Sequence, residues 1–243
     1  MEIKIQKILS DYGICSRRAG EELIQQGNVT VNGSIAMIGQ RADPEKDIIC
    51  VDGKTLSSKP EDTYILLNKP KGYVVTLNDE KGRRNVTDLL QELSVRVYPV
   101  GRLDINSEGL LILTNDGQFS NMLMHPSKEI EKEYYVWVRG KKLDKSIERL
   151  SLPMTIDNYR IKPAKVRVIE QDENGAQLSV IIHEGRNRQI RKMCENCGLY
   201  VTRLKRIREG SLTLGRLATG QWQYLSPKEV EKLRREAGIQ SSK

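Results

Sequence analysis

The chain has 243 residues, enough for one or two domains with a sizeable core. Charged residues account for 30% and hydrophobic residues for 38% of it, a balance typical of a folded globular protein and not of a disordered chain. Its longest apolar run is the five residues 134–138, and its amino terminus carries no apolar signal region. We therefore expect neither a membrane span nor secretion, and we expect a cytoplasmic location.

The positive charge is concentrated in one segment. The chain carries 40 basic and 32 acidic side chains, a net charge of +8, whereas the charges of residues 1–60 cancel. Residues 183–208 alone contribute +6. A solvated charged face usually mixes the two signs, so this segment predicts contact with the phosphates of a polyanion. Its basic residues are Arg186, Arg188, Arg191, Lys192, Arg203, Lys205, Arg206 and Arg208.

The cysteines do not follow a metal-binding or disulfide pattern. Cys194 and Cys197 form a Cys-x-x-Cys pair, but Cys15 and Cys50 lie far apart in the sequence and supply no second pair. A structural zinc site needs four ligands, usually in two close pairs, and a thioredoxin-type redox pair needs a βαβ context. We therefore expect ordinary helix thiols, a reducing compartment and no bound metal.

Residues 1–60 have the pattern of a separate small module. A first amphipathic helix ends at Gly13, and Ser16 is placed to cap a second helix that ends at Gly27. Two hairpins are predicted after the helices, one turning at Asn32-Gly33 and one at Asp52-Gly53. The module therefore combines two helices with two hairpins.

A polar stretch with a proline, residues 57–62, predicts a linker, and the remaining chain alternates strands and helices without a regular βαβ rhythm. The predicted strands cover residues 64–68, 73–76, 110–114, 134–139, 162–169, 177–183 and 201–207. The predicted helices cover residues 86–93, 119–124, 143–150, 187–197 and a last segment that begins with a capping box at Ser226. This pattern predicts an α+β domain around a mixed, mainly antiparallel sheet.

Several classes of enzyme lack their sequence motifs here. The chain has no P-loop and no Gly-x-Gly-x-x-Gly after a strand, which argues against nucleotide and dinucleotide cofactors. The zinc-protease motif His-Glu-x-x-His and the nucleophile elbow Gly-x-Ser-x-Gly do not occur. The only histidines are His125 and His183, so any catalysis is expected to use a carboxylate, without a cofactor.

Asp104 is the strongest candidate for that carboxylate. It lies in a polar loop directly before an apolar strand, and a loop held by a rigid strand is a good place for a reacting group. On spacing alone, a turn aspartate that accepts from nearby backbone amides is the more common explanation. A glycosidase that pairs Asp104 with Glu108 would need two carboxylates on either side of one bond, which a spacing of four residues near a loop does not ensure.

Residues 101–117, GRLDINSEGLLILTNDG, resemble the active-site motif of the ribosomal RNA pseudouridine synthases. Three further segments resemble the family's other motifs in the expected order: LLNKPKG at 66–72, KEY at 132–134 and HEGRNRQIRKM at 183–193. Residues 1–60 resemble the alpha-L RNA-binding module that this family carries in front. The resemblance thus implies two domains, residues 1–60 and 61–243, the second with the α+β fold of a pseudouridine synthase.

The resemblance also implies three catalytic roles. Asp104 matches the catalytic aspartate, Tyr134 the tyrosine that stacks on the target base, and Arg191 the basic residue that pairs with the aspartate. A guanidinium close to a carboxylate favours its ionised form and fixes its orientation. From the residues alone, a strand tyrosine packed against Trp137 is the more common explanation of Tyr134, and Arg191 could be one more phosphate contact.

We expect ribosomal RNA to be the partner, with the target uridine taken out of its stack. Large-subunit RNA is the preferred substrate because residues 184–193 and the segment LMHP at 123–126 resemble that subclass; small-subunit RNA and a non-catalytic role in ribosome assembly are the alternatives. We also expect a monomer. The residues expected to contact RNA, with Lys69 alternatively supporting the fold, are Lys7, Arg17, Arg18, Lys54, Lys69, Arg102, Arg186, Arg188, Lys192 and Arg206.

Overall fold

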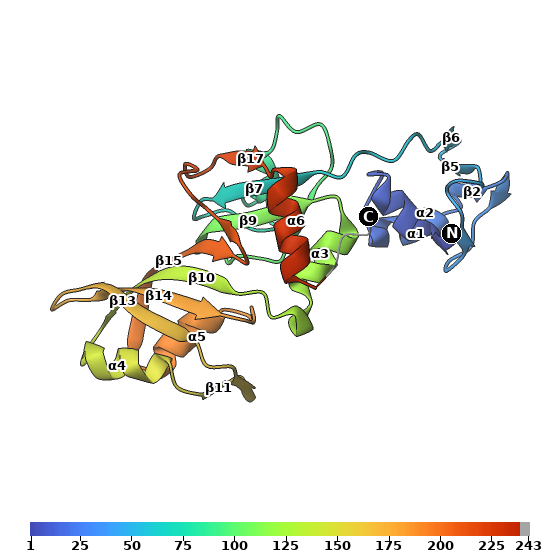
Figure 1. Ribbon diagram of the computed structural model, residues 1–243. Coiled ribbons are helices and arrows are strands. Elements are labelled where there is room, and N and C mark those ends of the chain that lie inside the picture. The colour runs from blue at the N-terminus through green and yellow to red at the C-terminus, as the bar shows by residue number, and fades with distance from the viewer. Residues whose placement is uncertain (239–243) are drawn as a thin grey trace. The chain divides into compact units, whose positions relative to one another are not determined.

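The computed structural model describes residues 1–238, which fall into two compact units. The first unit comprises Met1–Thr63 together with the short segments Leu93–Val97 and Asn115–Gly117. The second unit contains the rest of the chain, from Tyr64 onward. Figure 1 shows the two units coloured by residue number, the first in blue. No helix among residues 1–238 is long and apolar enough to cross a membrane.

The first unit contains the predicted helices and hairpins. The Ser16 hydroxyl accepts a hydrogen bond from the Ala19 amide at 3.1 Å and so caps the second helix, as the sequence predicts. The buried faces of both helices share one core with the strands, including Ile5, Ile24 and Val29. The elements are α1 (Ile5–Asp11), α2 (Arg17–Gln25), β2 (Val29–Val31), β3 (Ser34–Ile35), β5 (Ile49–Val51) and β6 (Lys54–Thr55), with an unpredicted pair of β1 (Ile3–Lys4) and β4 (Arg41–Ala42).

The second unit is built on a nine-stranded sheet. Its strands are β7 (Tyr64–Lys69), β8 (Tyr98–Val100), β9 (Glu108–Thr114), β10 (Lys132–Gly140), β13 (Lys165–Gln171), β14 (Ala176–Ile182), β15 (Leu199–Glu209), β16 (Leu212–Thr213) and β17 (Trp222–Tyr224). The order across the sheet is β13-β14-β10-β15-β9-β7-β17, with β16 beside β15 and β8 beside β9. The pair β15 and β9 is parallel and the other pairs are antiparallel, which confirms the predicted mixed, mainly antiparallel sheet.

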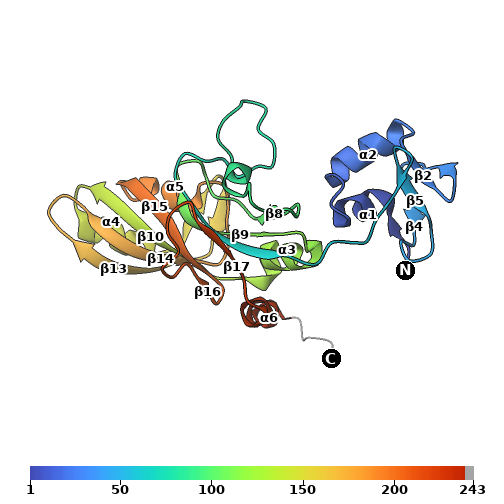
Figure 2. The same cartoon turned by 90° about the horizontal axis from the view of Figure 1, so that it is seen from above.

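Helices cover different faces of the two halves of this sheet. The helices are α3 (Gly117–Met124), α4 (Leu143–Leu150), α5 (Gln189–Asn196) and α6 (Pro227–Glu236), the last with the predicted Ser226 capping box. α3 and α6 form a core with β7 and β9, centred on Phe119 and Leu233. α5 packs on β15 and α4 on β10. Figure 2 shows α6 and α5 on opposite sides of the sheet.

Three predicted elements differ from the observed ones. The predicted strand 73–76 is only a single bridge from Val74 to Asn85, and the predicted helix 86–93 is one 3-10 turn, Val86–Leu89. The predicted strand 162–169 is interrupted: β12 (Tyr159–Ile161), paired with β11 (Met154–Ile156), ends before β13 begins at Lys165. Pro163 lies in the gap, and its missing amide hydrogen removes a donor that a continuous strand would need.

The two halves of the sheet meet at an unusually close backbone contact. β9 and β15 pair at only two positions, Glu108 with Lys205 and Gly109 with Arg206. A Cβ atom on Gly109 would lie 2.2 Å from the Arg206 carbonyl oxygen, and Gly109 has a φ of +104°. Only glycine meets both conditions without strain. This pairing, the β9–β15 junction, brings the loop before β9 next to β15 and α5.

Candidate active site

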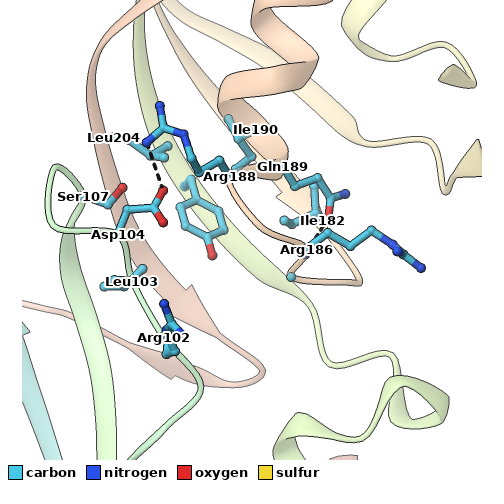
Figure 3. Close-up of a pocket in the computed structure, with 12 residues that line it drawn as sticks. Arg102, Leu103, Asp104, Ser107, Ile182, Arg186, Arg188, Gln189, Ile190 and Leu204 are labelled. Atoms are coloured by element: carbon cyan, nitrogen blue, oxygen red, sulfur yellow. Dashed lines mark hydrogen bonds and ion pairs between the residues drawn. The ribbon is translucent and has the colours of Figure 1, made fainter. Parts of the chain in front are cut away.

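A small cavity opens beside the β9–β15 junction, at the loop that precedes β9. Its volume is about 70 Å³. Figure 3 shows the side chains of Asp104 and Ser107 on one wall and those of Arg188, Gln189 and Ile190 on the other. Leu103, Ile182 and Leu204 give it apolar surfaces. Of the residues predicted from the sequence, the cavity brings together Asp104, Tyr134, Arg102, Arg186 and Arg188.

The loop that carries Asp104 is fixed through four consecutive carbonyl oxygens. Asp104 O accepts from the Ser107 amide at 2.9 Å and from Lys69 Nζ at 3.3 Å. The next carbonyl, that of Ile105, accepts from the Gly72 amide at 2.7 Å. Asn106 O accepts from an arginine of α5 at 2.9 Å, and Ser107 O accepts from Lys69 Nζ at 2.8 Å. Asp104 is therefore held at a defined position while its carboxylate remains partly exposed to the cavity.

Lys69 is a support for this loop and not an RNA contact. Its side chain is fully buried, and its ammonium donates to the carbonyls of Pro70, Asp104 and Ser107. Burial lowers the pKa of Lys69 to about 8, against the opposing attraction of Asp104 and Glu108. The prediction that Lys69 contacts RNA is wrong because no phosphate can reach a buried ammonium whose three hydrogens already point at backbone oxygens.

Arg188 makes the ion-pair contact with Asp104. Arg188 Nη1 lies 3.8 Å from Asp104 Oδ2, and both side chains are partly exposed, 47% and 29% respectively. Arg188 occupies the residue before α5 in a left-handed conformation, with a φ of 52°. This conformation turns its side chain toward the cavity, away from the course of the helix (Figure 3). The sequence analysis assigned Arg188 to phosphate contacts, so this pairing is a finding of the structure.

Arg191 lies one helical turn further along and does not contact the aspartate. Its guanidinium donates to Asn106 O at 2.9 Å and to Val201 O at 3.3 Å. Burial and the neighbouring charge of Arg188 lower the pKa of Arg191, while Asp104 acts against that shift. The predicted pairing of Arg191 with Asp104 is therefore wrong in its partner: Arg191 connects α5 to the Asp104 loop and to β15 through backbone oxygens.

Tyr134 enters the cavity from β10, supported by a buried arginine. Tyr134 is almost fully buried, and burial raises the pKa of its hydroxyl. Behind it, Arg206 is 2% exposed, donates to Leu110 O at 2.7 Å and pairs with Glu209 at 3.3 Å. Although burial opposes its charge, the attraction of Glu209 and Tyr134 raises the pKa of Arg206. The prediction that Arg206 contacts RNA is wrong, because this guanidinium lies inside the sheet.

The other predicted RNA-contact residues are distributed over both units. Arg102 and Arg186 are exposed and line the cavity, and Arg186 stacks on the ring of Tyr159 at 3.1 Å. Lys192 is not at the cavity; it forms an ion pair with Asp157. In the first unit, Lys7 pairs with Asp11 at 2.6 Å. Of the residues of the first unit that were expected to contact RNA, Arg17, Arg18 and Lys54 are exposed.

Two buried polar groups at the cavity were not singled out from the sequence. The Ser107 hydroxyl and the Gln189 amide nitrogen have no hydrogen-bond partner among the described residues. Gln189 Oε1 accepts from the Arg186 amide at 3.0 Å and so fixes the loop before α5. Both residues lie inside the motif segments, but their burial depends on contacts between distant parts of the chain, which motif spacing does not encode.

The alternative chemistries find no matching arrangement. Glu108 binds Arg203 and does not line the cavity, so it does not form a carboxylate pair with Asp104. Among residues 1–238, no three His, Cys, Asp or Glu side chains gather in a way that could hold a metal ion. Cys194 lies in α5, and burial raises the pKa of its thiol to about 12. The cavity therefore offers one carboxylate, one aromatic ring and three guanidinium groups, of which that of Arg188 pairs with the carboxylate.

These groups suit nucleophilic chemistry on a flat ring. A carboxylate held rigidly at a cavity wall can add covalently to an electrophilic carbon. The Arg188 guanidinium, 3.8 Å from the Asp104 carboxylate, can fix the orientation of that carboxylate. The Tyr134 ring and the apolar surfaces offer stacking and van der Waals contact to a base. Exposed Arg102 and Arg186 at the rim are placed to meet anionic groups of the same ligand.

Comparisons with known proteins identify the family. The model of the RNA pseudouridylate synthase family matches residues 63–196, and that of the S4 domain matches residues 3–49. The chain is 41% identical to ribosomal large subunit pseudouridine synthase B of Bacillus subtilis (strain 168), over 95% of each chain. It is 39% identical to an uncharacterized RNA pseudouridine synthase of Aquifex aeolicus (strain VF5), over 98% of this chain and 96% of that one.

A solved structure supports the same assignment. A crystal structure of a pseudouridylate synthase superposes with a TM-score of 0.66 at 27% sequence identity, covering 95% of this chain and 99% of the other. The matched part therefore includes residues of both units.

Proposed function

The chain belongs to the RNA pseudouridylate synthase family, and we propose that it isomerises one uridine of large-subunit ribosomal RNA to pseudouridine. The observation that carries the proposal is the single rigid carboxylate of Asp104 in a cavity with Tyr134 and Arg188. Relatives at about 40% identity over nearly the whole chain are named ribosomal large subunit pseudouridine synthase B, which supports the large-subunit substrate.

Asp104 is the proposed nucleophile. The reaction breaks the bond between ribose carbon 1′ and uracil N1, turns the base, and joins carbon 1′ to carbon 5; N1 gains a proton and carbon 5 loses one. The ionised carboxylate adds covalently to the ribose or to the base and holds that fragment until the new carbon–carbon bond forms. The four fixed carbonyls of its loop support this role, because a positioned nucleophile avoids the entropy cost of orientation.

The remaining cavity residues orient the reactants. Arg188 orients the Asp104 carboxylate toward the base, and Tyr134 provides the surface against which the base stacks while it turns. We assign Arg191 a positioning role, because both of its Nη atoms are bound to backbone oxygens.

The RNA is bound outside the cavity as well. Extrusion of a base costs a few kcal/mol, least in a loop or an irregular helix, so the substrate is an unpaired or distorted site. Arg102 and Arg186 at the rim are proposed to hold the flanking phosphates. We propose that residues 1–60 form an independent RNA-binding domain through Arg17, Arg18 and Lys54, and that the protein works as a monomer in the cytoplasm, where ribosomal RNA is made in bacteria.

The test is a map of pseudouridines in ribosomal RNA from cells with and without this chain. We expect one large-subunit pseudouridine to disappear in the deletion strain, to return with the wild-type gene, and not to return with Asp104→Asn. Loss of a small-subunit pseudouridine would instead identify the small-subunit alternative. An unchanged map, with defective ribosome assembly that Asp104→Asn corrects, would contradict the proposal in favour of a non-catalytic assembly role.

A further inference from the structure

A second and larger cavity lies on the far side of Arg188. It has a volume of about 440 Å³ and runs between α5 and the start of β15. Arg188 lines both this cavity and the one that contains Asp104, so the two cavities share this residue. Asp104 does not line the second cavity. The reaction described above therefore uses only the smaller cavity and leaves the larger one without a role.

The sequence around α5 explains why this cavity exists. Arg191 and Glu195 are spaced by four residues and so lie on one face of α5, and Arg188 is the residue directly before that helix. Gly198, with a φ of +77°, turns the chain from α5 into β15. At Leu199 to Leu204, β15 pairs with β10 on one edge, while its pairing with β9 begins only at Lys205. The cavity is lined by this helix face and by the first residues of β15.

The most conspicuous residue of the second cavity is an exposed tyrosine. Tyr200 lines the cavity and is 73% exposed, whereas its neighbours in the strand, Leu199 and Val201, are buried. The Arg191 guanidinium, bound to Val201 O and Asn106 O, forms a fixed part of the wall. An exposed aromatic ring next to cations is the usual arrangement for stacking an unpaired base.

We propose that this second cavity binds the nucleobase next to the target uridine, stacked on Tyr200. The inference rests on the proposed RNA substrate: when the target base enters the Asp104 cavity, a covalently linked neighbour must lie close to it, and Arg188 lines both cavities. Size agrees with this occupant, because a cavity of ~150 Å³ already admits a benzene ring and the second cavity is larger, at about 440 Å³.

The lining combines two arginines with one carboxylate, and the carboxylate suits the edge of a base. Glu195 is exposed and lines it, and a carboxylate repels phosphate oxygens while it accepts hydrogen bonds from the N–H groups of a base edge. The apolar wall includes the buried Leu199. Arg188, half exposed at the boundary, is the group placed to meet the phosphate between the target nucleotide and its neighbour.

The experiment compares Tyr200→Ala and Tyr200→Phe on the RNA that the wild-type enzyme modifies, and on the same RNA with an abasic residue at each neighbouring position in turn. We expect Tyr200→Ala to raise KM about 5- to 100-fold, the range for loss of one stacked base, with kcat changed less than threefold. Tyr200→Phe keeps the ring and should stay within threefold of wild type. On one of the two abasic RNAs, the KM of the wild type should rise by the same factor. On that RNA, the KM of Tyr200→Ala should not rise further.

The control is Tyr224→Ala, which removes another exposed tyrosine of the same unit, 61% exposed and outside both cavities. We expect it to match the wild type. The neighbouring base does not occupy this cavity if the KM of Tyr200→Ala also matches that of the wild type. The same conclusion follows if Tyr200→Ala raises KM on both abasic RNAs by as much as on the complete RNA. Failure of the proposed function is distinguishable, because the wild type itself would then form no pseudouridine in any ribosomal RNA.

Discussion

The guanidinium of Arg188 lies 3.8 Å from the carboxylate of Asp104, although the two residues come from opposite sides of the β9–β15 junction. The contact depends on the left-handed conformation of Arg188 before α5 and on the fixed carbonyls of the Asp104 loop. Both side chains remain partly exposed, so the pair can separate when a base enters. Because both side chains are partly exposed, the pair adds little to the stability of the fold, and its role is to orient the carboxylate.

Replacement of Arg188 should mainly reduce turnover. Arg188→Lys keeps the charge but loses the planar fork, and we expect kcat to fall about 10-fold; Arg188→Gln removes the charge, and we expect a fall of about 100-fold. Arg186→Gln is the matched control, an exposed arginine at the same rim that lacks contact with Asp104, and should raise KM and reduce the salt dependence of binding. The assignment is wrong if kcat of Arg188→Gln stays within threefold of wild type.

Asp104→Asn should abolish turnover and leave RNA binding nearly unchanged. The amide is almost the same size as the carboxylate, and the loop is held by backbone contacts that the substitution leaves intact, but the amide is a far poorer nucleophile. Turnover is measured as tritium release from RNA labelled at carbon 5 of uridine, and binding by filter retention. Activity within tenfold of wild type would remove Asp104 from the reaction.

Lys69→Met should lower the free energy of unfolding of the second unit by about 2–4 kcal/mol at neutral pH. Two or three buried carbonyls lose their hydrogen-bond donor, at a cost of ~1–3 kcal/mol each. Removal of the buried charge of Lys69 offsets part of this cost. Urea unfolding followed by tryptophan fluorescence measures this, since Trp137 and Trp222 both belong to the second unit. Lys71→Met, an exposed lysine two residues on, is the control and should change stability by less than about 0.5 kcal/mol.

The same pair of proteins tests the pKa of Lys69. The pKa is about 8 in the folded protein and 10.5 ordinarily, so between these values the folded state has released a proton that the unfolded chain still holds. The free energy of unfolding of the wild type relative to Lys69→Met should therefore rise between pH 8 and pH 10.5, by at most about 1.4 kcal/mol per pH unit. A difference that is constant over this range would contradict the lowered pKa.

Gly109→Ala should disrupt the β9–β15 junction. The new methyl group would meet the Arg206 carbonyl oxygen at 2.2 Å in a backbone conformation that favours glycine, so either the pairing or the chain must shift. We expect a loss of at least about 3 kcal/mol of stability and no measurable turnover. Gly185→Ala, where a Cβ meets no atom within 4 Å, is the control in thermal unfolding. Equal melting temperatures for the two variants would show that the junction tolerates a side chain.

The sequence predicted the architecture and the two central residues of the cavity, but not how the cations are used. Asp104 and Tyr134 occupy recognisable motif positions, and both line the cavity. Lys69 and Arg206 were expected to meet phosphates, yet both donate to backbone carbonyls inside the fold. Every residue carries such a carbonyl, so its use as an ion partner has no sequence signature.

The exchange of roles between Arg188 and Arg191 has a similar reason. The two residues are three positions apart beside one helix, and motif spacing alone gives either of them access to Asp104. The choice depends on Asn106 O, 85 positions before Arg191, which binds the Arg191 guanidinium, and on the left-handed backbone of Arg188. Element boundaries failed for comparable reasons: Val74 pairs only with Asn85 because no partner strand lies beside residues 73–76.

The β9–β15 junction makes the site a late product of folding. It joins Gly109 to Arg206, 97 positions apart in the chain. Asp104 and Lys69 belong to the sheet half on one side of it, and Tyr134, Arg188 and Arg191 to the half on the other. Contacts between such distant segments form slowly, because their loop must close first. A nascent chain that has not yet reached Arg206 therefore holds no assembled site, because the two walls of the cavity are not yet joined.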